Sequence, residues 1–325
     1  MALVSFFSAK GAPGATTTAM LVAALWPRPT LLVDADGAGG DVGLRLTAPT
    51  GAPLTRNPGL LTLLPLARHG LVPGVVLDHS QVALGGQRVL VGLENPAQAE
   101  AAGALWPTLA QAFHELPGMD VVIDAGRLNH RSFQLPLLQR SDVVVGVVRA
   151  DPTSVVHMRQ RLSLLHETFA PLGADAPRLG LVCVEDVQHQ GEAASAIQTV
   201  AAEVPDVLDL GQVALDPKAV RMFHGEPVFR PERSMIVRSG HTLVERLLAA
   251  AGPALAPPEE PYDVTQPTPD PAARNGAGPG AVEHAETQPA GDHAHQNGTP
   301  ADGTRDGEEE PVLRRPRRQR RRLFR

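Results

Sequence analysis

Lysine is nearly missing from this chain of 325 residues, because arginine supplies all but two of its 29 basic side chains. The two lysines are Lys10 and Lys218. The two cations are not interchangeable, since lysine presents a compact ammonium on a flexible stem and arginine a planar guanidinium. Lys10 also lies in a glycine-containing loop near the N-terminus. We therefore interpret Lys10 as a position that needs the ammonium group.

Cysteine and metal-binding sequence patterns are scarce as well. The one cysteine, Cys183, lies within an apolar run, which excludes a disulfide framework within the chain and predicts a reducing compartment. The 12 histidines are scattered, and neither a His-Glu-x-x-His pattern nor a Cys/His zinc spacing occurs. A Gly-x-Ser-x-Gly elbow is also missing, which argues against a Ser/His/Asp hydrolase.

Long apolar runs are missing too. No run approaches the roughly 20 apolar residues that cross a membrane. The apolar run at the N-terminus is short and soon interrupted, unlike a secretory signal peptide. We therefore expect a cytoplasmic protein. Aromatic residues are few, and we expect Trp26, Trp106 and Phe113 to pack in the core.

The composition of the chain changes at Gly252. Residues 1–252 are rich in Ala, Leu and Val, and strand-like runs alternate with helix-like runs. This pattern predicts one doubly wound α/β domain, with a mostly parallel sheet covered by helices on both faces. Within it, Asp151 followed by Pro152 predicts a helix start. Residues 253–310 hold mainly Pro, Gly, Ala and acidic residues, which predicts a disordered linker.

The basic tail, residues 311–325, reverses the charge of the linker. The linker has 12 acidic residues and two arginines, whereas the tail has eight arginines and no acid. Such a cluster attracts phosphates and carboxylates, so three partners stay open: an anionic membrane surface, nucleic acid, or an acidic protein surface. Pro316 interrupts any long helix here. A further interpretation is that the tail pairs with the acidic linker of its own chain.

The glycine-containing loop lies between a strand and a helix. Residues 2–7 are apolar and predict a buried strand, and residues 17–25 predict an apolar helix. Between them, Gly11 and Gly14 let backbone N–H groups approach an anion, and the helix start adds the positive end of its dipole. This order is typical of a phosphate-binding loop, although Ala15 occupies the place of the usual phosphate-binding lysine. An ordinary turn is the alternative.

Two further strands end in carboxylates. The apolar run over residues 30–36 ends in Asp34 and Asp36, and a second run ends in Asp124. Ligands of open α/β sheets bind at the carboxyl ends of the strands. An acid at such an end commonly holds Mg²⁺, directly or through water, and Thr16 offers a hydroxyl ligand. For Asp34 we favour a structural role, ending its strand or capping the next turn.

The loop resembles the deviant Walker A motif of MinD/ParA-type ATPases, KGGxGKT[ST], whose early lysine corresponds to Lys10. Residues 34–36, Asp-Ala-Asp, are similar to the switch I region of that family, and residues 122–124, Val-Ile-Asp, to its Walker B strand. The likeness covers about residues 1–250. It implies a P-loop NTPase fold of the MinD/ParA kind.

The resemblance also implies a ligand and roles for single residues. The ligand would be ATP with Mg²⁺, and the nucleotide-binding residues would be Lys10, Gly11, Ala12, Gly14, Ala15, Thr16 and Thr17. Thr16, Asp36 and Asp124 would hold the metal, and Asp36 would also orient the attacking water. In the family, the counterpart of Lys10 reaches across a sandwich dimer to the phosphates of the partner. The resemblance therefore implies a homodimer that forms on nucleotide binding, with Lys10 acting catalytically in trans.

Two departures from the family pattern bear on activity. Ala15 removes one charge-assisted bond, which lowers affinity about ten- to a hundredfold and leaves binding feasible. Hydrolysis depends more strongly on positive charge, so we expect a weak or partner-dependent ATPase. Glu185 occupies a position where relatives often carry an asparagine that contacts adenine, which puts the base contact in question.

Three functions remain open. The first is a nucleotide-switched protein that positions a pilus, secretion or division apparatus in the MinD/TadZ manner. Ala15 and the Gly-Gly-Asp-Val segment at residues 39–42 resemble the TadZ/CpaE branch. The second is a ParA-type DNA partition ATPase, and the third is a pseudo-ATPase scaffold. The protein partner is unknown, and the expected location is the cytoplasm, including the inner membrane face or the nucleoid.

Overall fold

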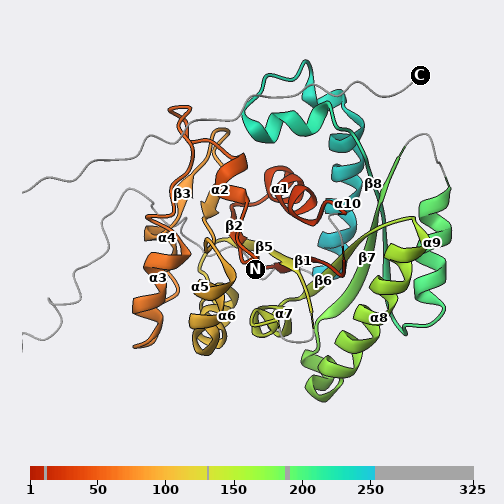
Figure 1. The fold of residues 1–325 in the computed structure, drawn as a ribbon, viewed down its shortest axis with the longest axis horizontal. Coiled ribbons are helices and arrows are strands. Elements are labelled where there is room, and N and C mark those ends of the chain that lie inside the picture. The colour runs from red at the N-terminus through yellow and green to blue at the C-terminus, as the bar shows by residue number, and fades with distance from the viewer. Residues whose placement is uncertain (11–12, 130–131, 187–190, 253–325) are drawn as a thin grey trace, which may run out of the picture. The chain divides into compact units, whose positions relative to one another are not determined.

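The computed structural model describes residues 1–10, 13–129, 132–186 and 191–252. These residues form an eight-stranded sheet in the order β3-β4-β2-β5-β1-β6-β7-β8 (Figure 1). The strands are β1 (Leu3–Ser8), β2 (Thr30–Asp34), β3 (Gln81–Val82), β4 (Arg88–Leu90), β5 (Asp120–Arg127), β6 (Val143–Arg149), β7 (Arg178–Glu185) and β8 (Leu208–Ala214). Neighbouring strands are parallel except for the β3–β4 pair. The predicted mostly parallel sheet is confirmed.

Helices cover both faces of this sheet. They are α1 (Ala15–Leu25), α2 (Val42–Arg45), α3 (Leu60–Ala67), α4 (Val75–Asp78), α5 (Pro96–Ala101), α6 (Trp106–His114), α7 (Leu135–Gln139), α8 (Pro152–Phe169), α9 (Glu192–Ala201) and α10 (Met235–Ala251). Short 3₁₀ segments include Gly103–Leu105, Ala170–Asp175, Ala219–His224 and Pro231–Arg233. Figure 1 shows α1 and α10 on one face and α6, α7 and α8 on the other. This is the doubly wound arrangement that the sequence predicts.

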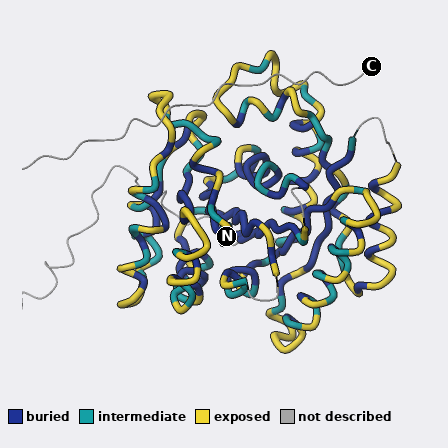
Figure 2. The backbone as a smooth tube through the Cα atoms, in the orientation of Figure 1, coloured by how far each residue is buried: buried dark blue, intermediate teal, exposed yellow. Residues whose placement is uncertain are grey.

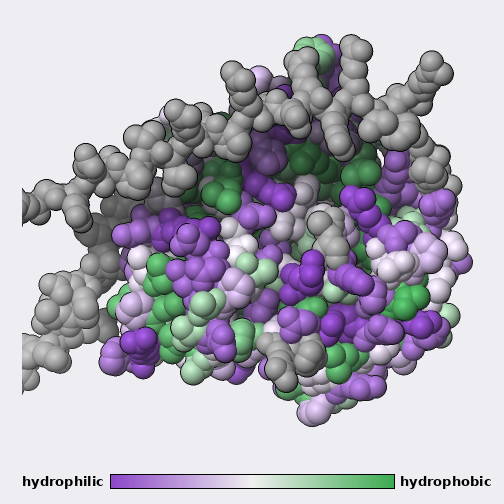
Figure 3. Space-filling model, in the orientation of Figure 1, coloured by the Kyte–Doolittle hydropathy of each residue, from purple (hydrophilic) through white to green (hydrophobic). Residues whose placement is uncertain are grey.

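The core lies in two layers, one on each side of the sheet. Successive side chains of a strand point to opposite faces. Accordingly, Leu3 and Phe7 of β1 pack with residues of α6 and α8, whereas Val4 and Phe6 pack with α1 and α10. Figure 2 shows the strands buried between the helices. On the face seen in Figure 3, hydrophilic residues predominate and apolar residues form separate patches.

Several local predictions can be compared with these elements. Trp26, Trp106 and Phe113 are buried, as expected, and so is Cys183 within β7. Helix α8 begins as predicted, because the Asp151 side chain accepts the Ser154 N–H at 2.9 Å and a proline follows at the first helical position. Among the described residues, no helix is both long and apolar enough to cross a membrane.

The bounds of three elements differ from the predictions. Helix α1 begins at Ala15, two residues before the predicted start, because the left-handed backbone of Gly14 already initiates it. Strand β2 ends at Asp34, since Asp36 turns away into the next loop. Strand β5 continues to Arg127, three residues beyond its predicted end, alongside the last residue of β1.

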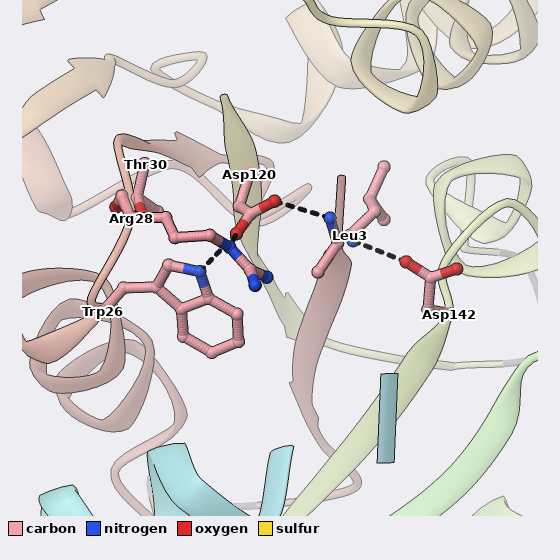
Figure 4. A network of polar contacts seen from close by, with 7 residues as sticks. Leu3, Trp26, Arg28, Thr30, Asp120 and Asp142 are labelled. Carbon is pink, nitrogen blue, oxygen red and sulfur yellow. Dashed lines mark hydrogen bonds and ion pairs between the residues drawn. The ribbon is translucent and has the colours of Figure 1, made fainter. Parts of the chain in front are cut away.

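The edge of the sheet at the amino ends of β1 and β5 fixes both β1 and α1 (Figure 4). Asp120 of β5 accepts hydrogen bonds from three donors: the Ala2 N–H (2.6 Å), the Trp26 Nε1–H (2.6 Å) and the Arg28 Nε–H (2.5 Å). Asp142 accepts the Leu3 N–H at 2.7 Å. Trp26 directly follows α1, so the end of this helix and the start of β1 are tied to one carboxylate. The strand and the helix that flank the cavity are therefore anchored to the same edge of the sheet.

Candidate functional site

A cavity of about 800 Å³ opens at the carboxyl ends of β1 and β5, beside the start of α1. Its wall is built by the first residues of α1 and by the loops that follow β2, β5 and β8. Strand β5 lies on one side of β1, and the next strand in the chain, β6, lies on the other side. The direction of the strand order therefore reverses at β1. Open α/β sheets bind their ligands in the crevice at such a switch point.

The start of α1 presents open backbone donors to this cavity. Gly14 precedes the helix with φ 106°, a left-handed conformation that strains any residue with a Cβ. Among the described residues no side chain caps the helix, and the first intrahelical bond runs from the Thr18 N–H to the Gly14 carbonyl at 2.8 Å. The N–H groups before Thr18 have no acceptor within the helix. Together with the helix dipole, they form a site suited to an anion.

The predicted nucleotide-binding residues are only partly brought together. Gly14, Ala15, Thr16 and Thr17 all line the cavity. Gly11 and Ala12 lie outside the described residues. Lys10 is exposed and absent from the cavity wall, and its Nζ lies 3.3 Å from Nε2 of His157 on α8. The ammonium thus lies against α8 rather than at the start of α1 in its own chain.

Asp124 carries an unpartnered oxygen next to the start of α1. The residue is 1% exposed, and its Oδ1 accepts the Gly126 N–H at 3.1 Å. Its Oδ2 has no hydrogen-bond partner among the described residues. Burial raises the pKa of Asp124 to about 6, while the Thr16 hydroxyl and the Gly126 N–H lower it. A buried carboxylate oxygen without a partner is costly, so this position fits a cation or its bound water.

Asp36 is half-buried and lines the same cavity. Its carboxyl lies over the backbone of Gly126, where an added Cβ would collide with it, and it accepts the Ala38 N–H at 2.8 Å. Burial raises the pKa of Asp36, and the nearby Asp41 raises it further, while Arg127 and the Ala38 N–H lower it. The acidic side chain is therefore held at the cavity wall by a glycine that leaves room for it.

The donor chemistry of the site fits Mg²⁺. Thr16, Asp36 and Asp124 offer only oxygen ligands, which Mg²⁺ prefers, and Mg²⁺ in nucleotide sites usually keeps waters and phosphate oxygens as well. Within the described ranges, no group of three or more His, Cys, Asp or Glu could hold a metal by itself. Protein residues alone would thus give an incomplete shell, as expected for a metal that arrives with phosphate.

Asp34 lies next to Asp124 in the register of β2 and β5 but faces a closed environment. It is fully buried and accepts the Val42 N–H at 3.1 Å and the Asp36 N–H at 3.4 Å. A Cβ on Gly40 would collide with its carboxyl oxygens. Burial and the charge of Asp124 raise the pKa of Asp34 to about 8, so it keeps its proton at neutral pH. This geometry fits the structural role expected for it.

Part of the cavity wall is apolar. Val184, Val213, Leu215 and Ile236 line it, a surface suited to a flat ring. Glu185, whose identity put the adenine contact in question, does not line this cavity. Its Oε1 instead accepts the N–H groups of Gly191 (2.9 Å) and Ala193 (3.1 Å) at the start of α9. Glu185 therefore stabilises a helix start and leaves the apolar wall clear.

Three arginines that the sequence motifs did not single out also line the cavity: Arg45, Arg127 and Arg149. Arg45 closes α2, and its Nη1 donates a hydrogen bond to the Thr17 hydroxyl at 3.1 Å. One feature of the sequence could have pointed to these arginines, namely the near absence of lysine. A chain that uses arginine almost everywhere can also use it for a cation within a site.

Comparison with known proteins identifies the fold. No protein-family model matches the sequence, and no curated protein is detectably similar to it. A ParA family ATPase from Chlorobium tepidum is similar in structure, with 16% identity and a TM-score of 0.55 over 76% of this chain and 98% of that chain. The ATP complex of McdA from Cyanothece gives 15% identity and a TM-score of 0.58 over 77% of this chain and 96% of that chain.

A third similar structure is the septum site-determining protein MinD from Pyrococcus horikoshii, complexed with Mg-ADP. It gives 18% identity and a TM-score of 0.56 over 77% of this chain and 97% of that chain. At such low identity the likeness shows the fold. The described residues therefore have the fold of MinD/ParA-type P-loop ATPases, as the sequence predicts.

Proposed function

We propose that this protein binds ATP with Mg²⁺, changes its assembly state with the bound nucleotide, and thereby positions a cellular apparatus. One observation carries the proposal: the buried Oδ2 of Asp124, which has no hydrogen-bond partner among the described residues, lies beside the uncapped helix start that borders a cavity of about 800 Å³. Asp124 itself is not one of the residues that line this cavity. A magnesium–phosphate ligand needs a negative group that binds the cation and open N–H groups that donate hydrogen bonds to the phosphate.

The roles proposed for single residues follow their positions. The backbone N–H groups around Gly14 and Ala15 bind the phosphates, and Thr16, Asp36 and Asp124 hold the metal. When bound, Mg²⁺ would neutralise phosphate charge. Asp36, with its carboxylate at the cavity wall, accepts a hydrogen bond from a water and orients it. The apolar part of the cavity wall takes the base.

Hydrolysis is proposed to be weak or dependent on a partner. Phosphoryl transfer is catalysed mainly by positive charge placed against the phosphates. Ala15 brings no charge to the start of α1, and Lys10 lies against α8 of its own chain. Lys10 is exposed at the surface, where a second copy can contact it, which supports the proposed homodimer with Lys10 acting in trans.

The cellular role is proposed from the neighbours in structure. They are a ParA family ATPase, McdA and the septum site-determining MinD, which supports a positioning ATPase in general. We propose a pilus, secretion or division apparatus as the cargo, in the TadZ/CpaE manner, with the protein in the cytoplasm and the basic tail against a phosphate-bearing surface. DNA partition of the ParA type is the alternative.

Calorimetric titration with Mg·ATP, paired with a phosphate-release assay, tests the proposal. We expect binding by the full chain, turnover that is slow without a partner, and much weaker Mg²⁺-dependent binding in Asp124→Asn. The exposed Asp78 provides a matched control, and Asp78→Asn should bind as the unmodified chain does. No binding by the unmodified chain would leave only a pseudo-ATPase scaffold.

A further inference from the structure

We infer that Arg45 supplies, within the same chain, the phosphate-facing cation that Ala15 lacks. The phosphates would then contact an arginine from the segment after β2 in addition to the start of α1. This inference rests on the proposed nucleotide binding. It concerns a residue for which no sequence motif predicted a role.

The position of Arg45 is the first observation. Its guanidinium donates to the Thr17 hydroxyl at 3.1 Å, and Thr17 is the third residue of α1. Arg45 lines the same cavity as Gly14, Ala15 and Thr16. Of the arginines on the described cavity wall, Arg127 and Arg149 come from strand ends, whereas Arg45 is hydrogen-bonded to α1 itself.

The charge of Arg45 is the second observation. In the described parts of the chain, no carboxylate lies within ion-pair distance of its guanidinium. A guanidinium has five N–H donors, so one bond to a neutral hydroxyl leaves donors for an anion.

The support beneath Arg45 is the third observation. Helix α2 is anchored at its first residue, because the Val42 N–H donates to the buried Asp34 carboxyl at 3.1 Å. Gly43 packs so closely that an added Cβ would lie 2.7 Å from Cγ1 of Val91. A cation on so short and tightly packed a segment is held in place before a ligand arrives, which is how a site gains affinity.

A purely local role is the competing explanation. Arg45 could serve only as a counter-ion for the acidic groups around it. Its loss would then lower the affinity for ATP and for AMP by the same factor. A cation that contacts phosphates makes a different prediction. Its loss should weaken the binding of ATP more than that of AMP, and a lysine introduced in place of Ala15 should restore ATP binding.

The test compares the unmodified full chain with Arg45→Gln, Arg45→Lys, Arg45→Gln combined with Ala15→Lys, and the control Arg68→Ala. Gln removes the charge and leaves a shorter polar side chain on the helix, and circular dichroism checks the folding of each variant. Arg68 is exposed on the opposite face of the sheet, after α3. Calorimetry measures Mg·ATP, and competition measures AMP.

We expect Arg45→Gln to weaken Mg·ATP about ten- to a hundredfold, with a smaller loss for AMP. Arg45→Lys should retain part of the affinity, Ala15→Lys should restore it in the Gln background, and Arg68→Ala should change nothing. Unchanged Mg·ATP affinity in Arg45→Gln, equal losses for ATP and AMP, or no rescue by Ala15→Lys would each overturn this inference alone. Absence of Mg·ATP binding by the unmodified chain would overturn the proposed function and this inference with it.

Discussion

Asp34 and Asp124 are paired in the register of β2 and β5, yet their surroundings give them different properties. Asp34 is enclosed by Gly40 and Gly92 and accepts two backbone N–H groups. Asp124, near the start of α1, keeps one oxygen without a partner among the described residues. Two adjacent buried carboxylates resist ionising together, so one holds a proton while the other is available to a cation.

The proton on Asp34 makes stability depend on pH. Its pKa is raised from 3.8 to about 8 by burial, so the folded state binds the proton more tightly than the unfolded state. The stabilising contribution is therefore complete below about pH 4 and is lost as the pH rises through about 8. Asn has the shape of a protonated Asp, so Asp34→Asn should remove this dependence.

Urea unfolding of the two proteins across that pH range measures the effect. The free energy of unfolding of the unmodified chain should decrease relative to that of Asp34→Asn as the pH rises. Asp78→Asn, which changes an exposed aspartate, should follow the unmodified chain. Parallel pH profiles for the unmodified chain and Asp34→Asn would contradict the assignment of the proton to Asp34.

At the scale of elements, the site depends on helix starts. Helix α1 is tied at its end through Trp26 to Asp120, which leaves its uncapped start fixed toward the cavity. Helix α2 is anchored by Asp34 through the Val42 N–H. Helix α9 begins at two N–H groups that bind Glu185. In each case a buried carboxylate positions a helix, and the uncapped start of α1 borders the cavity.

The assignment of Glu185 to α9 gives a prediction that separates stability from binding. Glu185→Ala leaves the N–H groups of Gly191 and Ala193 without their acceptor, which should cost about 1–3 kcal/mol of unfolding free energy. The affinity for Mg·ATP should stay the same, because Glu185 does not line the cavity.

Urea unfolding and calorimetry on the same samples test this. Glu192→Ala is the control, because Glu192 is an exposed carboxylate at the same helix start and its loss should cost less. A loss of nucleotide affinity in Glu185→Ala with unchanged stability would mean that Glu185 contacts the base.

The sequence predicted elements better than contacts. The runs of apolar residues were sufficient to predict β1 and α1, and the Asp151–Pro152 pair was sufficient for the helix cap, because these depend on neighbours along the chain. The contact between Arg45 and Thr17 joins residues 28 positions apart in sequence. Glu185 contacts residues only six and eight positions further on, but through a side chain that turns toward α9 and away from the cavity. Motif spacing carries no information about which way such side chains point, so both required the tertiary structure.

At the scale of the whole molecule, Lys10 and the basic tail are the proposed links to other molecules. Lys10 is exposed and lies against His157 rather than in its own cavity. Exposed apolar side chains occur near the cavity as well, with Leu44 on α2 71% exposed and Phe133 on the cavity wall 40% exposed. Burial of such residues against a second copy would favour association.

Lys10 has a matched control in the chain, because Lys218 is the other lysine. If Lys10 acts in trans, Lys10→Ala should lower the fraction of dimer formed with Mg·ATP and weaken apparent nucleotide affinity, while Lys218→Ala should do neither. Size-exclusion chromatography with light scattering measures the dimer. Normal ATP-dependent dimerisation of Lys10→Ala would rule out the trans-acting role.

The basic tail, which lies outside the described residues, makes a separate prediction. Each arginine near an anionic surface contributes about 1 kcal/mol, so the full chain should co-sediment with phosphatidylserine vesicles or with duplex DNA. A chain ending at Glu310 should bind neither. Equal binding by the two chains would exclude the tail as the anchor, and the preferred partner would separate membrane positioning from DNA partition.

The nucleotide switch itself is tested most directly by sedimentation velocity of the full chain with Mg·ATP and with Mg·ADP. The proposal predicts a dimer with Mg·ATP and a monomer with Mg·ADP, and a return to monomer when Mg²⁺ is removed by a chelator. The same sedimentation coefficient with either nucleotide and with none would contradict it.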